Sequence, residues 1–339
     1  MKSAPVDSRK QRSAVERQRR ERGLGVLKMQ SSARSARWWF VLCLVQAPAA
    51  LLFGTAAVAA EPARAPKVYI SVDMEGVAGV VTSDQLTPAG FEYERFRRFM
   101  TDEALAAVRA AKEAGATEIV VSDSHANGEN LLIDLFPNDV RIVRSWPRHG
   151  AMMAGLDASF TAAVFIGYHS STTNPKGVRA HTISSAHFAR LALNGNAVTE
   201  AELNAAYAGD FGVPVVFASG DDAAVSEIKG RLGDIDTVTT KTSLGFHSAE
   251  TLTPAASCER IYAGVKSALA RPGQRRPYTL AHPVTLDLTF KNYMPAEILS
   301  YLRAVQRVDS HTIRFVGRDM PEVTDFIDVV DWYNPDVAP

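Results

Sequence analysis

Short apolar, β-branched runs alternate with amphipathic stretches along most of the chain. Residues 68–72 (VYISV), 118–121 (EIVV) and 162–167 (AAVFIG) have the composition of buried strands. Between the first two runs, residues 91–114 place apolar and small side chains at helical spacing, and Gly115 is suited to end that helix. Strands separated by helices predict a parallel sheet, because parallel neighbours need a crossover connection.

Further elements of both kinds follow toward the C-terminus. The expected strands are 140–143, 213–218 and 284–290, and the expected helices are 200–208 and 258–270. Residues 183–193 lead into Asn194-Gly195, the strongest two-residue turn signal, and so predict a β-hairpin. We predict the α/β fold class, with a mostly parallel sheet covered by helices on both faces and a smaller α+β lobe at the C-terminal end.

The first 60 residues differ in composition from the rest. They hold 11 Lys or Arg and 3 Asp or Glu, out of 37 of each in the chain, so the remainder is mildly acidic. An Arg-rich stretch precedes an apolar segment from Trp38 to Phe53, which ends in the small residues 56–60. This order is typical of a secretory signal peptide, with Met29 as an alternative start. We therefore expect a periplasmic or secreted protein, a retained membrane anchor being the alternative.

Composition narrows the class of protein. The 339 residues are 46% hydrophobic and 22% charged, which excludes an intrinsically disordered chain. An acidic body gives no reason to expect nucleic-acid binding. After residue 60 only Cys258 remains, so no internal disulfide is expected. We expect residues 61–250 to form the catalytic core and residues 251–339 to form a C-terminal α+β part of the same unit.

Acidic and imidazole side chains follow the ends of the predicted strands. Asp73 and Glu75 follow the first strand, His125 follows the second, and His169 follows the run at 162–167. Parallel strands place their carboxyl ends at one edge of the sheet, where ligands bind, so these side chains are expected to converge. Carboxylates and imidazoles are ligands that zinc accepts, and two neighbouring ions could activate water and polarise a carbonyl. The sequence therefore predicts a metal site at this edge.

The same residues resemble the motifs of a known peptidase family. The segments 71–76 (SVDMEG), 122–125 (SDSH) and 167–169 (GYH) are similar, in order and spacing, to the D-aminopeptidase family of dinuclear zinc peptidases. The similarity continues through His181 and through Glu200 in the segment VTEAELNA. It extends over nearly all of the chain that follows the predicted signal peptide.

The resemblance implies roles for individual residues. Asp73 would bridge two zinc ions, and the other implied ligands are Glu75, His125, His169 and Glu200. His181 matches the histidine that the family is proposed to use in catalysis, although the loop before it is one residue longer than the family pattern. Asn204 lies one helical turn after Glu200 and would either contact substrate or orient Glu200.

The resemblance also implies an activity and an assembly. Two zinc ions per subunit would release N-terminal D-amino acids, D-alanine in particular, from short peptides. The family is built as a decamer of two stacked pentamers, so a homo-oligomer is expected. The predicted signal peptide departs from the cytoplasmic members and would bring the protein to D-amino-acid peptides derived from the cell wall.

Two other functions fit parts of the pattern. A phosphoesterase could use the same kind of two-metal site, but it would need cationic groups for phosphate, and Lys176 and Arg179 lie in a single loop. An exported peptide-binding protein would suit the acidic body. It would not need a convergent set of carboxylates and imidazoles.

Overall fold

The computed structural model describes residues 65–271 and 275–333. The signal peptide predicted for residues 1–60 lies outside the described residues. The described part belongs to one compact unit that follows residue 60. Within these ranges, every helix is too short or too polar to cross a bilayer.

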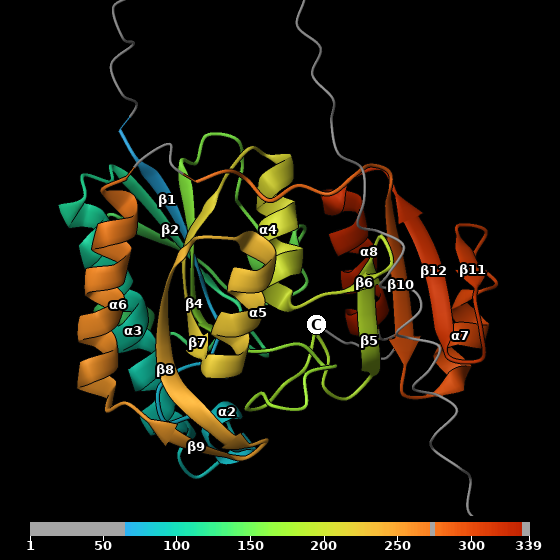
Figure 1. Cartoon of the computed structure of the whole chain (residues 1–339), viewed down its shortest axis with the longest axis horizontal. Helices are drawn as coiled ribbons and strands as arrows, with labels where there is room; N and C mark the ends of the chain where they lie inside the picture. Colours follow the sequence, from blue (N-terminus) through green and yellow to red (C-terminus); the bar gives the residue numbers. More distant parts are fainter. Residues whose placement is uncertain (1–64, 272–274, 334–339) are drawn as a thin grey trace, which may run out of the picture. The chain divides into compact units, whose positions relative to one another are not determined.

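The main sheet has seven strands in the order β3-β2-β1-β4-β7-β8-β9 (Figure 1). The strands are β1 (Lys67–Val72), β2 (Glu118–Asp123), β3 (Val140–Val143), β4 (Ala162–Tyr168), β7 (Val215–Asp221), β8 (Asp236–Gly245) and β9 (Ser248–Thr251). All neighbours are parallel except β8 and β9, which form a hairpin. Strand order reverses between β1 and β4, and ligands of such sheets bind beyond the carboxyl ends at this reversal.

Helices cover both faces of the main sheet. The helices α3 (Tyr93–Glu113) and α6 (Pro254–Leu269) pack on one face, and α4 (Glu200–Asp210) and α5 (Asp222–Leu232) pack on the other (Figure 1). Side chains of β1 alternate between these layers, because Val68 and Ile70 join the cluster with α3 and α6 while Tyr69 joins the cluster with α4. Continuous burial of β1 follows from this double cover.

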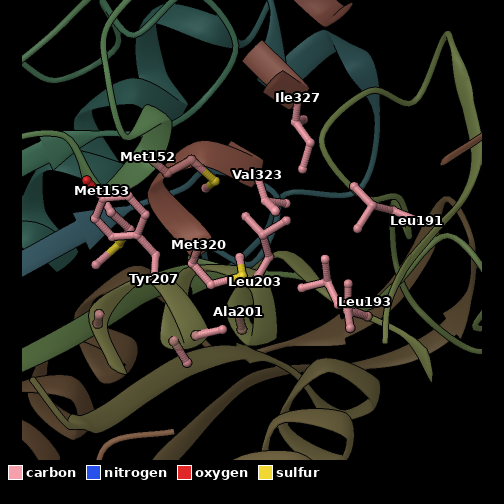
Figure 2. Packing of buried hydrophobic residues seen from close by; sticks show 14 of the residues in the cluster. Met152, Met153, Leu191, Leu193, Ala201, Leu203, Tyr207, Met320, Val323 and Ile327 are labelled. Atoms are coloured by element: carbon pink, nitrogen blue, oxygen red, sulfur yellow. The ribbon is translucent and has the colours of Figure 1, made fainter. Parts of the chain in front are cut away.

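A second sheet is antiparallel and has the order β11-β12-β10-β5-β6. Its elements are β5 (Phe188–Leu193), β6 (Asn196–Ala197), β10 (Val284–Phe290), β11 (Val305–Arg307), β12 (Thr312–Gly317), α7 (Tyr293–Leu299) and α8 (Met320–Trp332). Figure 2 shows α8 turning Met320, Val323 and Ile327 toward side chains of α4 and β5. This shared core joins the second sheet to the main sheet through α4.

Short elements complete the described chain. They are α2 (Ser83–Leu86) and the 3-10 turns η1 (Ile133–Leu135) and η2 (Ala151–Met153). The η2 turn packs against α4 and α8 and brings Met152 to the region where the two sheets meet.

The predicted fold class is confirmed, and two local details differ from the prediction. The hairpin arm begins at Phe188 rather than at Ile183, because the Ile183 amide N donates to the Glu200 carboxylate (2.6 Å) instead of joining a strand. The second sheet also takes β5 and β6 from before residue 250, whereas α6 from after it covers the main sheet. The division at residue 250 stays a prediction.

Candidate metal centre

The sheet register brings the predicted ligands to one edge. Val72, the last residue of β1, lies opposite Asp123 of β2 and Ile166 of β4. The chain segments just beyond these positions carry Asp73, His125 and His169, which therefore leave the sheet at one level. Glu200 is the first residue of α4, whose N-cap Thr199 accepts a hydrogen bond from the Glu202 amide.

A close backbone approach shapes the loop after β1. The Gly76 amide donates to the Gly167 carbonyl (2.7 Å), and a Cβ at Gly76 would lie 2.0 Å from the Tyr168 carbonyl oxygen. Only glycine fits there without a shift of the backbone. The Gly of the SVDMEG motif therefore lets the loop that carries Asp73 and Glu75 lie directly on the end of β4.

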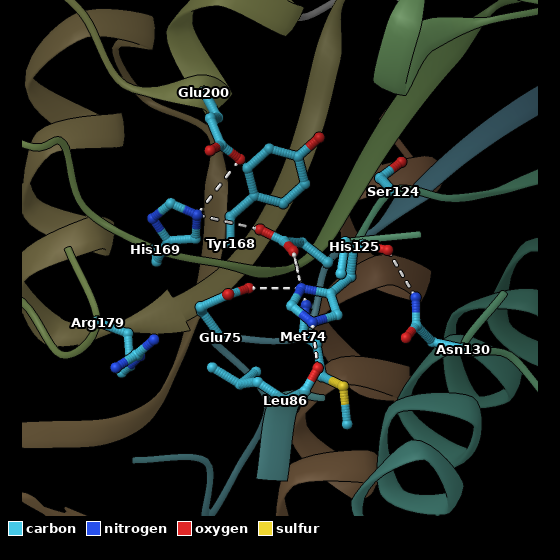
Figure 3. Close-up of polar contacts among 12 residues, drawn as sticks. Met74, Glu75, Leu86, Ser124, His125, Asn130, Tyr168, His169, Arg179 and Glu200 are labelled. Atoms are coloured by element: carbon cyan, nitrogen blue, oxygen red, sulfur yellow. Dashed lines mark hydrogen bonds and ion pairs between the residues drawn. The ribbon is translucent and has the colours of Figure 1, made fainter. Parts of the chain in front are cut away.

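One half of the centre joins β1 to β2 (Figure 3). The Nδ1 atom of His125 lies 2.9 Å from Glu75 Oε2 and 3.3 Å from Asp73 Oδ1. All three side chains are buried. Asp123 fixes the loop that carries His125, because its carboxylate accepts hydrogen bonds from the Asn130 and Leu131 amides (2.6 and 2.7 Å).

The other half joins β1 to β4 and α4. The Nε2 atom of His169 lies 3.3 Å from Asp73 Oδ2 and 3.3 Å from Glu200 Oε2. The two carboxylate oxygens of Asp73 therefore face different halves of the centre. Two groups of three residues, which share His169, could each hold a metal ion, because within each group the ligand atoms lie within 4.8 Å of one another. The first group is Asp73, Glu75 and His169, and the second is His169, His181 and Glu200.

The donor atoms fit a metal. Asp73 Oδ2, Glu75 Oε2 and His169 Nε2 are buried and lack a hydrogen-bond partner in the described part of the chain. Buried polar atoms normally have a partner, so the convergence of these three fits the binding of a cation. Carboxylate oxygen and imidazole nitrogen together are a donor set that zinc accepts.

Backbone carbonyls set the tautomers of both imidazoles. His125 Nε2 lies 2.9 Å from the Leu86 carbonyl oxygen, and His169 Nδ1 lies 3.1 Å from that of Ser170. A carbonyl only accepts, so these nitrogens carry the hydrogen and donate. The opposite nitrogen of each ring then faces the carboxylates, which is the nitrogen that a deprotonated imidazole would offer to a metal.

Burial and charge act against each other at these groups. Burial, and then the charge of Glu75, raise the pKa of Asp73. Burial alone would raise the pKa of Glu75 and lower the pKa of His125. The interaction between the two groups is stronger than burial, so the pKa of Glu75 lies well below its usual value and the pKa of His125 lies well above it. The carboxylates therefore favour positive charge beside them, which a proton on the imidazole supplies and which a bound cation would supply in its place.

The predicted catalytic histidine lies beside the ligands but is less enclosed. The rings of His181 and His169 are stacked, with centroids 4.0 Å apart. His181 Nδ1 donates to the Arg179 carbonyl (2.8 Å), which leaves the Nε2 lone pair free, 3.7 Å from Glu200 Oε1. This geometry allows a proton-transfer role and also a ligand role, so the predicted catalytic assignment stays a prediction.

Asn204 lies behind the centre. Its side chain is fully buried and donates to the Tyr168 hydroxyl (2.9 Å), which in turn is 2.8 Å from Ser71 Oγ. Asn204 is not among the residues that line the cavity described below. Its contacts support β4 rather than a substrate, and the expected contact with substrate has no support from its position.

Lys241 of β8 is a buried residue near the centre that the sequence motifs did not reveal. Its Nζ donates to the carbonyl oxygens of Glu75 and Val77, the latter at 2.8 Å. Burial lowers the pKa of Lys241 to about 8. The side chain clamps the loop that carries Asp73 and Glu75. A lone Lys in a Thr-rich strand is the only signal that the sequence offers for it.

A cavity of about 420 Å³ opens beside the ligands. Its lining includes Asp73, Glu75, His125, His181, Glu200, Trp146, Met152, Arg179, Ile183, Ser184, Asp328, Asp331 and Trp332. Part of the wall comes from α8, and Trp332 of this helix stacks on Trp146 with ring centroids 5.7 Å apart. Of the two cations considered for phosphate binding, Arg179 lines the cavity, whereas the exposed Lys176 does not.

A doubly wound sheet with carboxylates and imidazoles at its switch point is typical of a metal-dependent hydrolase. Comparison with known proteins identifies the family of hydrolases. The model of the peptidase M55 family, described as D-aminopeptidase, matches residues 67–329. The D-aminopeptidase of Bacillus subtilis (strain 168) is 30% identical over 259 residues, which cover 76% of this chain and 93% of that protein.

A solved structure agrees. The Zn-dependent D-aminopeptidase DppA from Bacillus subtilis, described as a self-compartmentalizing protease, matches with a TM-score of 0.75 and 29% identity. The match covers 78% of this chain and 96% of that chain. The chain therefore belongs to the D-aminopeptidase family, and the predicted class of enzyme, a metallo-aminopeptidase, is confirmed.

Proposed function

We propose that the protein is an exported, zinc-dependent aminopeptidase that releases N-terminal D-amino acids of the D-alanine type from short peptides. One observation carries the proposal: buried, unpartnered atoms of Asp73, Glu75 and His169 converge beside an open cavity. Family membership favours peptide hydrolysis at this site over phosphate-ester hydrolysis and over peptide binding without cleavage. The zinc dependence named for the structural relative supports zinc as the metal.

We infer two zinc ions per subunit from the shape of the ligand set. Asp73 presents Oδ1 to His125 and Oδ2 to His169, so its carboxylate has one oxygen for each half of the centre. Glu75 and His125 would complete one half, and His169 and Glu200 the other. Bridging carboxylates are common where two cations lie close together, because they reduce the repulsion between them.

Bound zinc would supply Lewis-acid chemistry, polarising the peptide carbonyl and making water nucleophilic near neutral pH. His181 would accept the proton of the attacking water at Nε2 and pass it to the leaving amine, since its Nδ1–H is held by the Arg179 carbonyl. The stacked His169 ring keeps the His181 ring in this orientation. The cavity beside the ligands, whose lining includes α8, would hold the peptide.

Export and assembly complete the proposal. The composition of residues 1–60 supports a signal peptide, and a location outside the inner membrane would give access to wall-derived D-amino-acid peptides. We propose a homodecamer, as in the family that the motifs resemble; the self-compartmentalizing relative supports an oligomer. Exposed apolar side chains on and after α7, including Met294, Ile298 and Tyr301, offer surface for contacts between subunits.

The test is hydrolysis of matched stereoisomers by the purified protein. D-Ala-D-Ala and L-Ala-L-Ala are supplied with zinc, and then with a chelator that removes it. The proposal predicts release of D-alanine from the D-peptide only, lost with chelator and restored by zinc. Equal cleavage of the L-peptide would contradict the stereochemical part. Activity that survives complete zinc removal would contradict the metal-dependent mechanism.

A further inference from the structure

Five carboxylates line the cavity, and three of them, Asp73, Glu75 and Glu200, are assigned to the metal centre. The other two, Asp328 and Asp331, come from the part of the wall that α8 supplies. Asp328 lies one helical turn before Asp331 and Trp332, and all three line the cavity. The core-facing side of α8 carries Val323 and Ile327 instead (Figure 2).

The two α8 carboxylates differ in their partners. Asp331 Oδ1 lies 3.2 Å from His187 Nδ1 and is therefore paired. Asp328 Oδ2 is buried with no hydrogen-bond partner, and the described residues offer Asp328 no ion pair within 4 Å. A buried acceptor that lacks a donor destabilises the protein, so a ligand that brings a donor would bind favourably there.

The neighbouring cation, Arg148, does not form an ion pair with Asp328. Its Nε donates to the Ala151 carbonyl (2.9 Å) and its Nη2 to the Asp123 carbonyl (2.7 Å), while its Nη1 is buried without a partner among the described residues. Burial, followed by the charge of Asp325, raises the pKa of Asp328 to about 7; Asp331 adds to this rise, whereas Arg148 and His149 oppose it. An added positive charge would favour the ionised carboxylate.

The substrate of an aminopeptidase supplies such a charge. Its first residue carries an α-ammonium group, a cation with three donors, on the carbon next to the carbonyl of the bond that is cut. We propose that Asp328 binds the α-ammonium group of the peptide's N-terminal residue. This inference rests on the proposed aminopeptidase function. It explains why cleavage would occur after the first residue: a carboxylate in the same cavity as the metal ligands anchors the free amino end.

The experiment compares the zinc-loaded wild type with Asp328→Asn, which keeps the shape and removes the charge. With D-alanine p-nitroanilide as substrate, we expect the KM of the variant to rise about 10–100-fold while kcat stays within about threefold. Competitive inhibition supplies a second measurement. D-Alanine should inhibit the wild type more strongly than propionate, which lacks the ammonium group, and Asp328→Asn should lose this difference.

Two controls separate binding of the amine from a structural role. Asp331→Asn makes the same change on the same wall, and it should keep the preference for D-alanine over propionate. Asp328→Glu keeps the charge and should retain part of that preference, which covers the case in which Asp328→Asn does not fold. Equal weakening of D-alanine and propionate in Asp328→Asn, or an unchanged preference, would overturn the inference and leave the metal centre as the group that binds the amine. Failure of the wild type to release D-alanine would contradict the proposed function instead. Direct binding of D-alanine and propionate to the zinc-loaded protein, measured by calorimetry, needs no turnover and would still test the role of Asp328.

Discussion

The imidazoles of the centre are oriented by contacts that no motif describes. The carbonyl oxygens of Leu86 and Ser170 accept hydrogen bonds from the outer nitrogens of His125 and His169. Neither Leu86 nor Ser170 belongs to the motifs that predict the ligands. The sequence therefore predicts the ligand types, because a strand end followed by Asp, Glu or His is visible in it. It does not predict which nitrogen faces the metal, because backbone carbonyls from separate loops decide that.

His181 provides a prediction at the scale of one residue. Its Nε2 faces Glu200 with a free lone pair, so His181→Ala should remove a proton carrier without removing a main ligand. We expect kcat for a D-alanyl substrate to fall about 10²–10⁴-fold while the zinc content stays unchanged. Metal analysis and steady-state kinetics on the same preparation measure both quantities. If the variant loses one zinc together with its activity, His181 is a ligand and its assigned role is wrong.

Glu103 of α3 connects this helix to α6 and to the loop after β1. Its Oε1 accepts hydrogen bonds from the Ala78 amide (3.1 Å) and from Ser257 Oγ of α6 (2.7 Å), while Oε2 is buried without a partner among the described residues. Burial raises the pKa of Glu103 from its usual 4.5 to about 7. The carboxyl thus ties two helices to the loop after β1, and ionising it costs stability.

The sign of the pH effect follows from this shift. Between pH 4.5 and 7 the folded protein holds a proton on Glu103 that the unfolded chain has lost, so the stability contributed by this group falls as pH rises through about 7. Glu103→Gln does not titrate. We expect it to gain about 2–3 kcal/mol in free energy of unfolding, relative to wild type, when the pH is raised from 5 to 8.

Urea denaturation at both pH values measures this gain. Glu94→Gln, at an exposed position on the same helix, is the matched control and should differ from wild type equally at pH 5 and pH 8. A difference between Glu103→Gln and wild type that does not change with pH would show that the Glu103 carboxyl ionises as it does in the unfolded chain.

The elements that the sequence predicts well are those with apolar periodicity. The strand at 284–290 and the helix beginning at Glu200 are as expected, because burial on one or both faces leaves a clear pattern. The strand β8 is not predicted. Its Thr-rich sequence pairs with β7, and its polar side chains contact the loop after β1. Polar strands of this kind carry little hydrophobic signal.

At the scale of the whole molecule, the two walls of the cavity come from distant parts of the chain. Motifs near the strand ends predict the ligand wall, whereas the α8 wall with Asp328 and Trp332 follows only from the packing of the second sheet on α4. An acidic residue on an amphipathic C-terminal helix resembles any solvated helix face in sequence. The sequence therefore predicts the residues that would hold the metals. It does not predict the residues of α8 that would bind the substrate.

We propose that Asp73 joins two zinc ions in one centre. This bridging role is tested by the number of zinc ions bound per chain, measured by mass spectrometry on the purified protein and on Asp73→Ala, with the exposed Asp84→Ala as control. We expect two zinc ions per chain in the wild type and in the control. We expect fewer than two in Asp73→Ala, together with loss of D-alanine release. A wild type that binds a single zinc, or an Asp73→Ala variant that retains two, would contradict the bridging role.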